Sequence, residues 1–262
     1  MSLFRPRIIP VVLIDRDGQA VKTISFNKRV YLGDPINIIS LFGSFEVDEL
    51  ILLDIDATRN NRVISFDILR DIASEASMPF SVGGGISTID DIDRVLSMGA
   101  EKVVLSDAVF TKPGFLEKAS NRFGSSTISV CINIKKTLFK GYRLYLPYEK
   151  KVRKMDILQA AQFCQECGVG EIIIQSVDED GRMEGYDQNI YRDVSSLIEV
   201  PIVALGGAED IHGMLDLYKN THVSGLAAGS MFVFSDKKNR GVLVNYPEIT
   251  DIESVFVGQM RL

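Results

Sequence analysis

The sequence predicts an α/β protein, a closed (β/α)8 TIM barrel built from two similar halves. Short apolar runs alternate with helical patterns along the 262 residues, and the runs are too continuous for strands with one face in water, which indicates a parallel sheet. The motif at residues 79–85, an apolar run that ends in glycines, returns at residues 201–207, an offset of 122 residues. This half-length repeat favours a closed barrel over a doubly wound open sheet.

The repeat extends upstream of the two glycine motifs. Glu171 lies 122 residues after Glu49, and Asp178 lies 122 residues after Asp56. Several matched positions at one spacing indicate a duplicated half-domain. The length suits one barrel, and no linker or low-complexity segment divides the chain, so we expect a single domain over residues 1–262.

Strands and helices are expected in strict alternation. The apolar runs predict strands at residues 7–13, 49–54, 79–82, 102–106, 128–133, 171–175, 201–204 and 223–228. Helices are expected at residues 35–45, 65–76, 88–98, 113–123, 155–167, 188–198, 210–218 and 236–244. Pro35 lies in the first turn of the first helix, where proline is favoured. In such a barrel, ligands bind at the C-terminal ends of the strands.

Two connections are longer than the others. Residues 14–33 contain Arg16, Asp17 and Gly18 followed by more charged side chains, and we expect a polar lid loop over the mouth of the barrel. Residues 135–154 alternate in polarity around their centre, which indicates a small hairpin. The basic side chains of this second connection indicate a solvated face.

Composition excludes several classes of function. The formal net charge is −6, and no basic face for nucleic acid is evident. No apolar run is long enough to span a membrane or to serve as a secretory signal, so we expect a cytoplasmic protein with reduced thiols. Cys164 and Cys167 lie in a helical pattern without a second pair, and His212 and His222 lack ligand spacing. We therefore expect no metal and no cofactor.

Each glycine motif follows a predicted strand and precedes a predicted helix, as in many phosphate sites. Glycines let the backbone approach an anion, and the first N–H groups of a helix point toward it. Gly84 and Gly85 form the first loop, and Gly206 and Gly207 form its repeat. One glycine run of this kind is about equally compatible with a tight turn that binds nothing. The repeat favours a phosphate ligand, which the acidic charge balance restricts to a small molecule.

Charged residues mark both ends of the predicted strands. Asp54 and Asp180 are candidates for acid–base work at the C-terminal ends, whereas Asp56 and Asp178 more plausibly cap a helix or order a loop. At the opposite end, two cations and two anions lie at or next to the starts of strands, and balanced charge makes a buried ring tolerable there. We expect this salt-bridge ring to be a plug or a gate; its members are Arg7, Glu49, Lys102 and Glu171.

These motifs together resemble the cyclase subunit of imidazole glycerol phosphate synthase, a half-repeat phosphate-binding barrel that receives ammonia from a separate glutaminase. The resemblance covers nearly the whole chain. It is carried by residues 7–10 (RIIP), 33–35 (GDP), 48–50 (DEL), 53–55 (LDI), 82–86 (VGGGI), 101–103 (EKV), 176–181 (SVDEDG), 185–187 (GYD) and 206–208 (GGA).

The resemblance implies roles for residues at both ends of the barrel. It makes the salt-bridge ring the gate of an ammonia channel, and it makes Glu101, beside the gate lysine, part of a docking surface for a glutaminase subunit. It places one phosphate site at Gly84, Gly85 and Ser106. The second phosphate site consists of Gly206, Gly207, Gly229 and Ser230.

The chain also departs from that family. The family has a catalytic aspartate in the first strand, where this chain has Leu13 or Ile14 in a segment with one extra residue. It has a second aspartate at the end of the fifth strand, where this chain has Asn133. Leucine and asparagine cannot exchange a proton as carboxylates do, so we expect the histidine-pathway reaction to be absent. Asp107 replaces a threonine beside one phosphate site and would repel a phosphate there.

A second branch resembles the chain more closely, namely the cyclase-like proteins of bacterial surface-polysaccharide biosynthesis. That branch lacks the first aspartate and shares residues 33–37 (GDPIN) and 53–57 (LDIDA). It implies an ammonia-conducting subunit that turns an acetamido group into an acetamidino group on a phosphorylated or nucleotide-linked sugar, together with a glutaminase and an amidotransferase-like partner. The mouth residues would be Lys22, Asp54, Asp180 and Asn133.

Two alternatives stay open at this point. The chain could be an ordinary histidine-pathway cyclase that uses a displaced acid such as Asp15. It could instead be a catalytically silent scaffold that activates a glutaminase docked on its floor.

Overall fold

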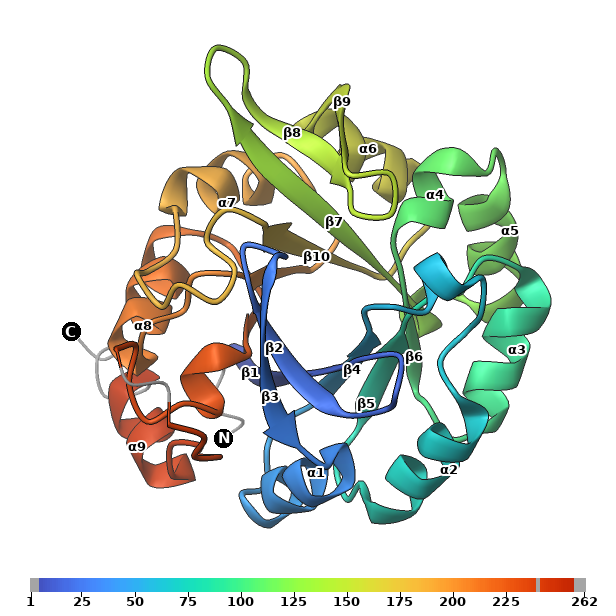
Figure 1. The fold of residues 1–262 in the computed structure, drawn as a ribbon. Helices are drawn as coiled ribbons and strands as arrows, with labels where there is room; N and C mark the ends of the chain where they lie inside the picture. Colours follow the sequence, from blue (N-terminus) through green and yellow to red (C-terminus); the bar gives the residue numbers. More distant parts are fainter. Residues whose placement is uncertain (1–4, 239–240, 257–262) are drawn as a thin grey trace.

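Eight parallel strands close into a barrel in the computed structural model, which describes residues 5–238 and 241–256 (Figure 1). Neighbouring strands pair in chain order, and pairing between the fifth and sixth barrel strands completes the ring. The predicted (β/α)8 barrel is confirmed. Its strands are β1 (Arg7–Ile14), β4 (Leu50–Asp54), β5 (Phe80–Gly83), β6 (Lys102–Leu105), β7 (Ile128–Thr137), β10 (Glu171–Ser176), β11 (Ile202–Leu205) and β12 (Gly225–Ala228).

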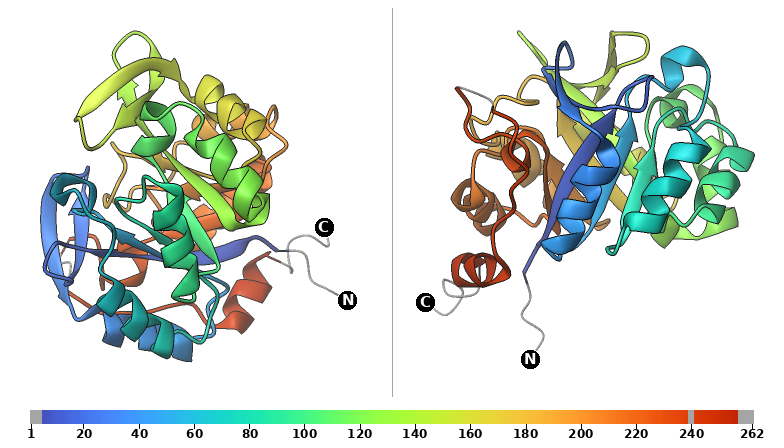
Figure 2. Two further views of the ribbon diagram at one scale, coloured as in Figure 1. Left: turned by 90° about the vertical axis from the view of Figure 1, so that its right-hand side faces the viewer. Right: turned by 60° about the horizontal axis from the view of Figure 1, so that its bottom comes forward.

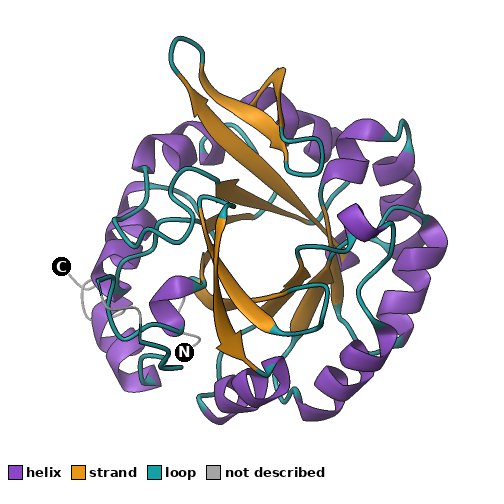
Figure 3. Cartoon of the chain, in the orientation of Figure 1, coloured by secondary structure: helices purple, strands orange, loops and turns teal. Residues whose placement is uncertain are grey.

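Helices surround the barrel (Figure 3). They are α1 (Pro35–Ser44), α2 (Phe66–Glu75), α3 (Ile89–Ser97), α4 (Asp107–Thr111), α5 (Phe115–Phe123), α6 (Ile157–Glu166), α7 (Gln188–Ser195), α8 (Ile211–Asn220) and α9 (Ile249–Phe256). Short 3₁₀ turns are η1 (Thr58–Asn60), η2 (Ser125–Thr127) and η3 (Ser230–Phe232). No helix of the described segments is long and apolar enough to span a membrane.

Side-chain caps begin several of these helices. Asp34 accepts a hydrogen bond from the backbone of Ile36 and is followed by proline at the first helical position. Thr88 and Asp91 form a reciprocal capping box at the start of α3. Asp210 accepts from the backbone N–H of Gly213 at the start of α8. These local signals explain why the helix starts could be predicted closely.

The half-length repeat is visible in the backbone. The bounds of β11 are those of β5 moved by 122 residues, and Ile211 begins α8 as Ile89 begins α3. Each half also starts with a strand that continues into an antiparallel hairpin. The first half therefore contributes β1, β4, β5 and β6 to the barrel, and the second contributes β7, β10, β11 and β12.

The two hairpins lie at the same end of the barrel (Figure 2). The first hairpin consists of β2 (Ala20–Ile24) and β3 (Lys28–Gly33). A polar lid loop was expected here, but the two segments pair as antiparallel strands. The second consists of β8 (Gly141–Leu146) and β9 (Lys151–Asp156), which confirms the hairpin prediction.

Two apolar layers stabilise the barrel. The larger layer fills the space between the strands and the outer helices. The smaller one fills the barrel interior with Ile9, Val11, Leu13, Val21, Ile51, Val104, Cys131, Ile173, Val203, Leu205 and Ala227. Because the strands are buried on both faces, their sequences are continuous apolar runs.

One predicted helix is wrong. Residues 236–238 and 241–244 are not helical; Phe234 and Val242 form an isolated antiparallel bridge, and residues 239–240 lie outside the described part. Polar turn-forming residues and Gly241 favour this reversal over a helix. The C-terminal helix is instead α9, which buries Ile252 and Phe256 against the core.

Candidate active site at the mouth of the barrel

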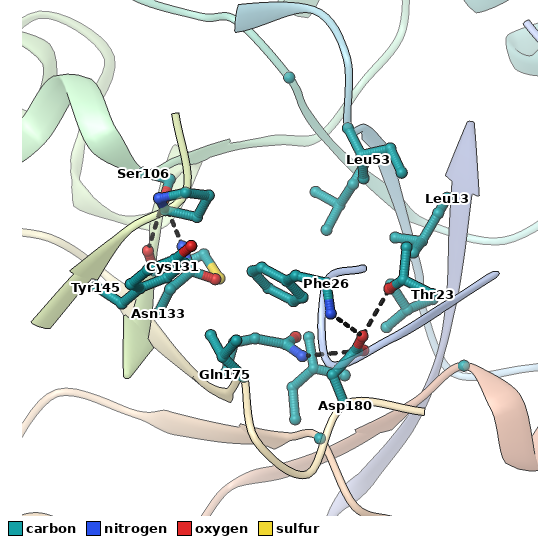
Figure 4. Close-up of a pocket in the computed structure, with 18 of the residues that line it drawn as sticks. Leu13, Thr23, Phe26, Leu53, Ser106, Cys131, Asn133, Tyr145, Gln175 and Asp180 are labelled. Atoms are coloured by element: carbon teal, nitrogen blue, oxygen red, sulfur yellow. Dashed lines mark hydrogen bonds between the residues drawn. The ribbon is translucent and has the colours of Figure 1, made fainter. Parts of the chain in front are cut away.

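A pocket of about 410 Å³ opens at the C-terminal ends of the barrel strands, and we call it the mouth. Residues at the ends of seven barrel strands, the loop directly after β5, and both hairpins contribute to its wall. Figure 4 shows Asn133 with Ser106 on one side and Asp180 with Thr23 on the other, with Phe26 between them. The predicted catalytic residues Lys22, Asp54, Asp180 and Asn133 all line this pocket.

Asp180 connects the first hairpin to the mouth. Its carboxylate accepts hydrogen bonds from Thr23 Oγ1 at 2.6 Å and from the backbone nitrogen of Phe26 at 3.3 Å (Figure 4). Gln175 Nε2 donates a third at 3.4 Å. Burial raises the pKa of Asp180, and these donors together with the Lys22 ammonium oppose that rise. The carboxylate therefore fixes the turn of the hairpin as well as facing the pocket.

Lys22 lies on β2 and is buried in the wall of the mouth. Its ammonium donates to the carbonyl of Val11 at 2.5 Å. A Cβ atom added at Gly229 would lie 1.8 Å from Lys22 Nζ, so the ammonium rests against the Gly229 backbone. Burial lowers the pKa of Lys22 to about 8, against the opposing charge of Asp180. At pH 7 the charged form still dominates.

Asp54 ends β4 and is held by Arg62. The Arg62 guanidinium forms a short ion pair with the carboxylate, which also accepts from the Asp56 backbone at 3.0 Å. Burial raises the pKa of Asp54, and the Arg62 contact opposes this. Since β4 and β10 are diametrically opposed in the ring of strands, Asp54 and Asp180 enter the mouth from opposite walls, each with its own donors.

Asp56 and Asp178 order loops, as predicted for them. Asp56 accepts two hydrogen bonds of 2.6 Å from the Arg29 guanidinium and one of 3.2 Å from the Arg16 backbone. Asp178 accepts from the Lys136 backbone at 2.7 Å. Both carboxylates thus tie a hairpin to a neighbouring strand end.

Leu13 and Asn133 occupy equivalent positions of the two halves. Leu13 pairs with Leu53, and Asn133 pairs with Gln175, which is the repeat counterpart of Leu53. Leu13 faces the barrel interior whereas Ile14 faces the outer helices, so Leu13 is the residue at the mouth.

Asn133 belongs to a small polar group. Its Nδ2 donates to Ser106 Oγ at 2.9 Å, and Ser106 Oγ donates to the carbonyl of Cys131 at 3.1 Å (Figure 4). Neither a leucine nor a hydrogen-bonded amide can act as a general acid or base.

Neighbouring backbone atoms leave no space for a side chain in the two glycine loops. An added Cβ at Gly85 would lie 1.9 Å from the Arg62 carbonyl, and one at Gly207 would lie 2.2 Å from the Gly185 carbonyl. Gly84 and Gly206 also have positive φ, and an added Cβ at either would lie 2.7 Å from a backbone oxygen. Backbone packing alone therefore explains these four glycines. The predicted phosphate residues line the mouth, namely Gly84, Gly85, Ser106, Gly206, Gly207, Gly229 and Ser230.

The opposite end of the barrel is closed by four charged side chains, which we call the floor ring. Arg7 bonds to Glu49 at 2.5 Å and forms a short ion pair with Glu171. Lys102 approaches the same two carboxylates at 3.1 and 3.6 Å. Each ion therefore has two partners of opposite sign, and the predicted ring exists. Its interior side is the apolar layer below the mouth.

The sequence matches the family model described as histidine biosynthesis protein over residues 7–238. This chain belongs to the histidine biosynthesis protein family. Among residues 5–238 and 241–256 of this family member, no group of three histidine, cysteine or acidic side chains is placed to hold a metal ion.

Relatives of this family member cover nearly its full length. The putative imidazole glycerol phosphate synthase subunit hisF2 of Pseudomonas aeruginosa is 38% identical over 251 residues, 96% of this chain and 99% of that protein. Subunit hisF3 of Vibrio vulnificus, also named as putative, is 39% identical over 246 residues, 94% of each chain. The subunit HisF of Streptococcus mutans is 32% identical over 234 residues, 89% of this chain and 93% of that protein.

Sequence reasoning misses several contacts in this histidine biosynthesis family member. Gln175 could have been found, because its counterpart in the repeat, Leu53, is apolar. Ser81 and Ser129 are hydroxyls inside apolar strands, and they donate to the two floor-ring carboxylates at 2.7 and 3.2 Å. Arg62 lies in a loop without periodicity, so no pattern identifies it. Glu101, the predicted docking residue, is exposed next to Lys102.

Proposed function

We propose that this barrel is the ammonia-conducting synthase subunit of a glutamine-dependent amidation system. Its substrate is an N-acetylated sugar that carries a phosphate or a nucleotide, and its product carries an acetamidino group. The observation that carries this proposal is the floor ring below an apolar interior that leads to a mouth without an acid pair at Leu13 and Asn133.

The apolar interior suits an uncharged nucleophile. Ammonia crosses a dry apolar path more readily than ammonium, because burying an unpaired charge is costly. The side chains that fill the interior between the ring and the mouth are apolar, among them Ile9, Val11, Ile51 and Ile173, and the proposal requires them to part for ammonia. A glutaminase docked on the floor, where Glu101 is exposed, would release ammonia directly below the ring.

The amidotransferase-like partner first transfers a phosphoryl or adenylyl group from a nucleoside triphosphate to the acetamido oxygen. At the mouth, ammonia adds to the activated carbon, the carbon–oxygen bond breaks, and the oxygen leaves with the phosphate or nucleoside monophosphate. The barrel then contributes orientation and charge stabilisation through Lys22, Asp54, Asp180 and Asn133. This division of labour accounts for a mouth that keeps charged groups such as Asp54 and Asp180 but has no acid at Leu13 or Asn133.

The test compares two nitrogen sources. Lys102→Met opens the floor ring without adding charge, and Lys237→Met, which removes an exposed ion pair with Glu209, is the matched control. The chain with its glutaminase and amidotransferase partners receives ¹⁵N-glutamine or ¹⁵N-ammonium and a panel of nucleotide-linked N-acetylated sugars. Lys102→Met should lower glutamine-driven labelling at least tenfold and spare ammonium-driven labelling. Equal losses with both sources would contradict channelling.

The second candidate is the cyclase subunit of imidazole glycerol phosphate synthase, which the names of the relatives favour. Growth of a cyclase-deficient histidine auxotroph carrying this chain would support it and overturn the amidation proposal. Stimulation of a glutaminase without labelling of any sugar would support the third reading, a catalytically silent scaffold.

A further inference from the structure

The two halves of the mouth carry different charges at one repeated position. Asp107 follows the end of β6, and Gly229 follows the end of β12 at the repeat offset of 122 residues. Both residues line the mouth. The same place in the duplicated fold thus bears a carboxylate in the first half and no side chain in the second.

The cation next to this position also differs between the halves. Lys22, from the hairpin of the first half, places its Nζ against Gly229 of the second half and donates to the Val11 carbonyl. Lys22 reaches that place from β2 because β1 and β12 are neighbours in the closed barrel. The space that a side chain at residue 229 would take is thus filled by the Lys22 side chain, so a buried ammonium lies where the other side of the mouth has a carboxylate.

The strand register identifies the counterpart of Lys22. On the first hairpin, Val21 pairs with Leu13, so Lys22 is one residue beyond that pair. On the second hairpin, Ile134 pairs with Leu144, and continuing this register places residue 145 opposite Asn133. Leu146 is therefore the equivalent of Lys22, and it is buried in the outer apolar layer. Asp107 therefore has neither a glycine in its own place nor a lysine at the position equivalent to Lys22.

The Asp107 carboxylate is held in place by its neighbours. It accepts a hydrogen bond of 2.9 Å from the Tyr148 backbone, and Ser106 Oγ lies 3.5 Å from its other oxygen. Ser106 is in turn bonded to Asn133. This side of the mouth offers a carboxylate, a hydroxyl and an amide, a set that suits hydroxyl or amine groups.

We infer that the mouth binds a substrate with two unlike ends. The side of the mouth at the ends of β11 and β12, with Lys22 from the first hairpin and with Gly206, Gly207 and Gly229, holds one phosphate-type anion. The side at the ends of β6 and β7, with Asp107, Ser106 and Asn133, holds a neutral or cationic end rich in hydroxyl or amine groups. The inference rests on the proposed function in taking the substrate to be a phosphate-bearing small molecule, and it excludes substrates with a phosphate at each end.

Other charged side chains lie on both sides of the mouth. Asp180 lies near the Lys22 ammonium and accepts from three donors, Thr23, Phe26 and Gln175, so its charge is compensated by more partners than that of Asp107. Arg59 and Lys150 line the first half from the exposed rim, and the Lys135 ammonium lies 5.5 Å from the centre of the Tyr145 ring. Asp107 is less exposed than Arg59 and Lys150, so its charge is less screened by water than theirs.

Counting bound phosphate tests the inference without any amidation assay. Equilibrium dialysis of the full chain against ³²P-labelled inorganic phosphate gives the number of sites per chain. We expect one site in the wild type, none in Lys22→Met, and two in Asp107→Asn, with the second site at least tenfold tighter than any residual second site of the wild type. Asp67→Asn, which alters an exposed carboxylate on α2, should keep one site.

Several results would overturn the inference. Two sites of similar affinity in the wild type would show that Asp107 does not exclude phosphate, and no site in the wild type would remove the second-half anion site. A site that persists in a folded Lys22→Met, verified by circular dichroism, or a count that stays at one in Asp107→Asn, would contradict the roles assigned to these residues. None of these outcomes bears on channelling, which the two nitrogen sources test separately.

Discussion

The Arg29 guanidinium donates two hydrogen bonds of 2.6 Å to the Asp56 carboxylate, and this pair joins the first hairpin to the loop after β4. Asp56 is almost fully buried, whereas Arg29 is about one-third exposed. A bidentate pair of this geometry restrains both partners more than a single contact does. The hairpin that covers the mouth is therefore fastened at β3 by Arg29 and at its turn by Asp180.

Arg29→Met should loosen the hairpin without unfolding the barrel. We expect a loss of about 1 kcal/mol in the free energy of unfolding, because partial exposure of Arg29 weakens the pair. Hydrogen exchange should accelerate at the β2 and β3 amides and remain unchanged in β10 and β11. Arg70→Met, which removes an exposed ion pair with Asp67 on α2, is the control. Equal exchange rates in Arg29→Met and the wild type would contradict the fastening role.

The same pair predicts a pH dependence. The pKa of Asp56 lies below its usual value near 3.8, mainly because Arg29 donates hydrogen bonds to the carboxylate. The unfolded state then binds the proton more readily than the folded state, so the stabilisation is present above pH 4 and disappears as the pH falls through the folded-state pKa. Thermal unfolding from pH 6 to pH 3 should show the gap between wild type and Asp56→Asn closing at the acid end. A constant gap would refute this linkage.

Lys22→Met should cost no stability at pH 7. A pKa lowered from 10.5 to about 8 corresponds to about 3 kcal/mol of unfavourable free energy for the charged form in the folded protein. The hydrogen bond to the Val11 carbonyl offsets about 1 kcal/mol of this unfavourable free energy. Urea unfolding should find the variant as stable as the wild type or more so, with exposed Lys118→Met unchanged.

The sign of the Lys22 effect with pH is a separate check. Between pH 8 and pH 10.5 the unfolded lysine keeps a proton that the folded one releases, so wild-type stability should gain a contribution that rises with pH over this range. Lys22→Met should lack that contribution. A variant at least 2 kcal/mol less stable than the wild type at pH 7 would make Lys22 a structural residue.

Gly207→Ala should be strongly destabilising. Its φ of +106° is unfavourable for any side chain, and the new Cβ would meet the Gly185 carbonyl at 2.2 Å. We expect a loss of about 3 kcal/mol or more in chemical denaturation. Gly213→Ala in α8 is the matched control, because its nearest neighbour would lie at 3.6 Å and alanine favours helices. Similar stabilities for the two variants would mean that the loop relaxes around Gly207.

Most of the barrel could be predicted because one physical signal fixes each strand: burial on both faces requires an apolar run. The floor ring could be predicted because charged residues such as Glu49 and Glu171 interrupt that signal at strand starts. The contacts at the mouth could not, because they depend on loop geometry. Arg62 reaches Asp54 across a loop, and Tyr148 reaches Asp107 through its backbone, which leaves no trace in residue type.

The wrong helix at residues 236–244 has a similar cause. A local pattern compatible with a helix does not show whether the rest of the fold offers a surface for that helix to pack against. Here Phe234 and Val242 pair as an antiparallel bridge instead. The first hairpin was equally hard to foresee, because Lys22 and Thr23 are polar by type although the fold buries both.

The floor ring also has a consequence for how the barrel could open. Four ion pairs connect four side chains in a loop, so any one pair can part while every member keeps a neighbour of opposite charge. A row of isolated pairs would instead strand two charges at each opening. The closed circuit of ion pairs is then interrupted at one place, and the total charge of the ring stays balanced. The opening is the gap between the two side chains that have separated.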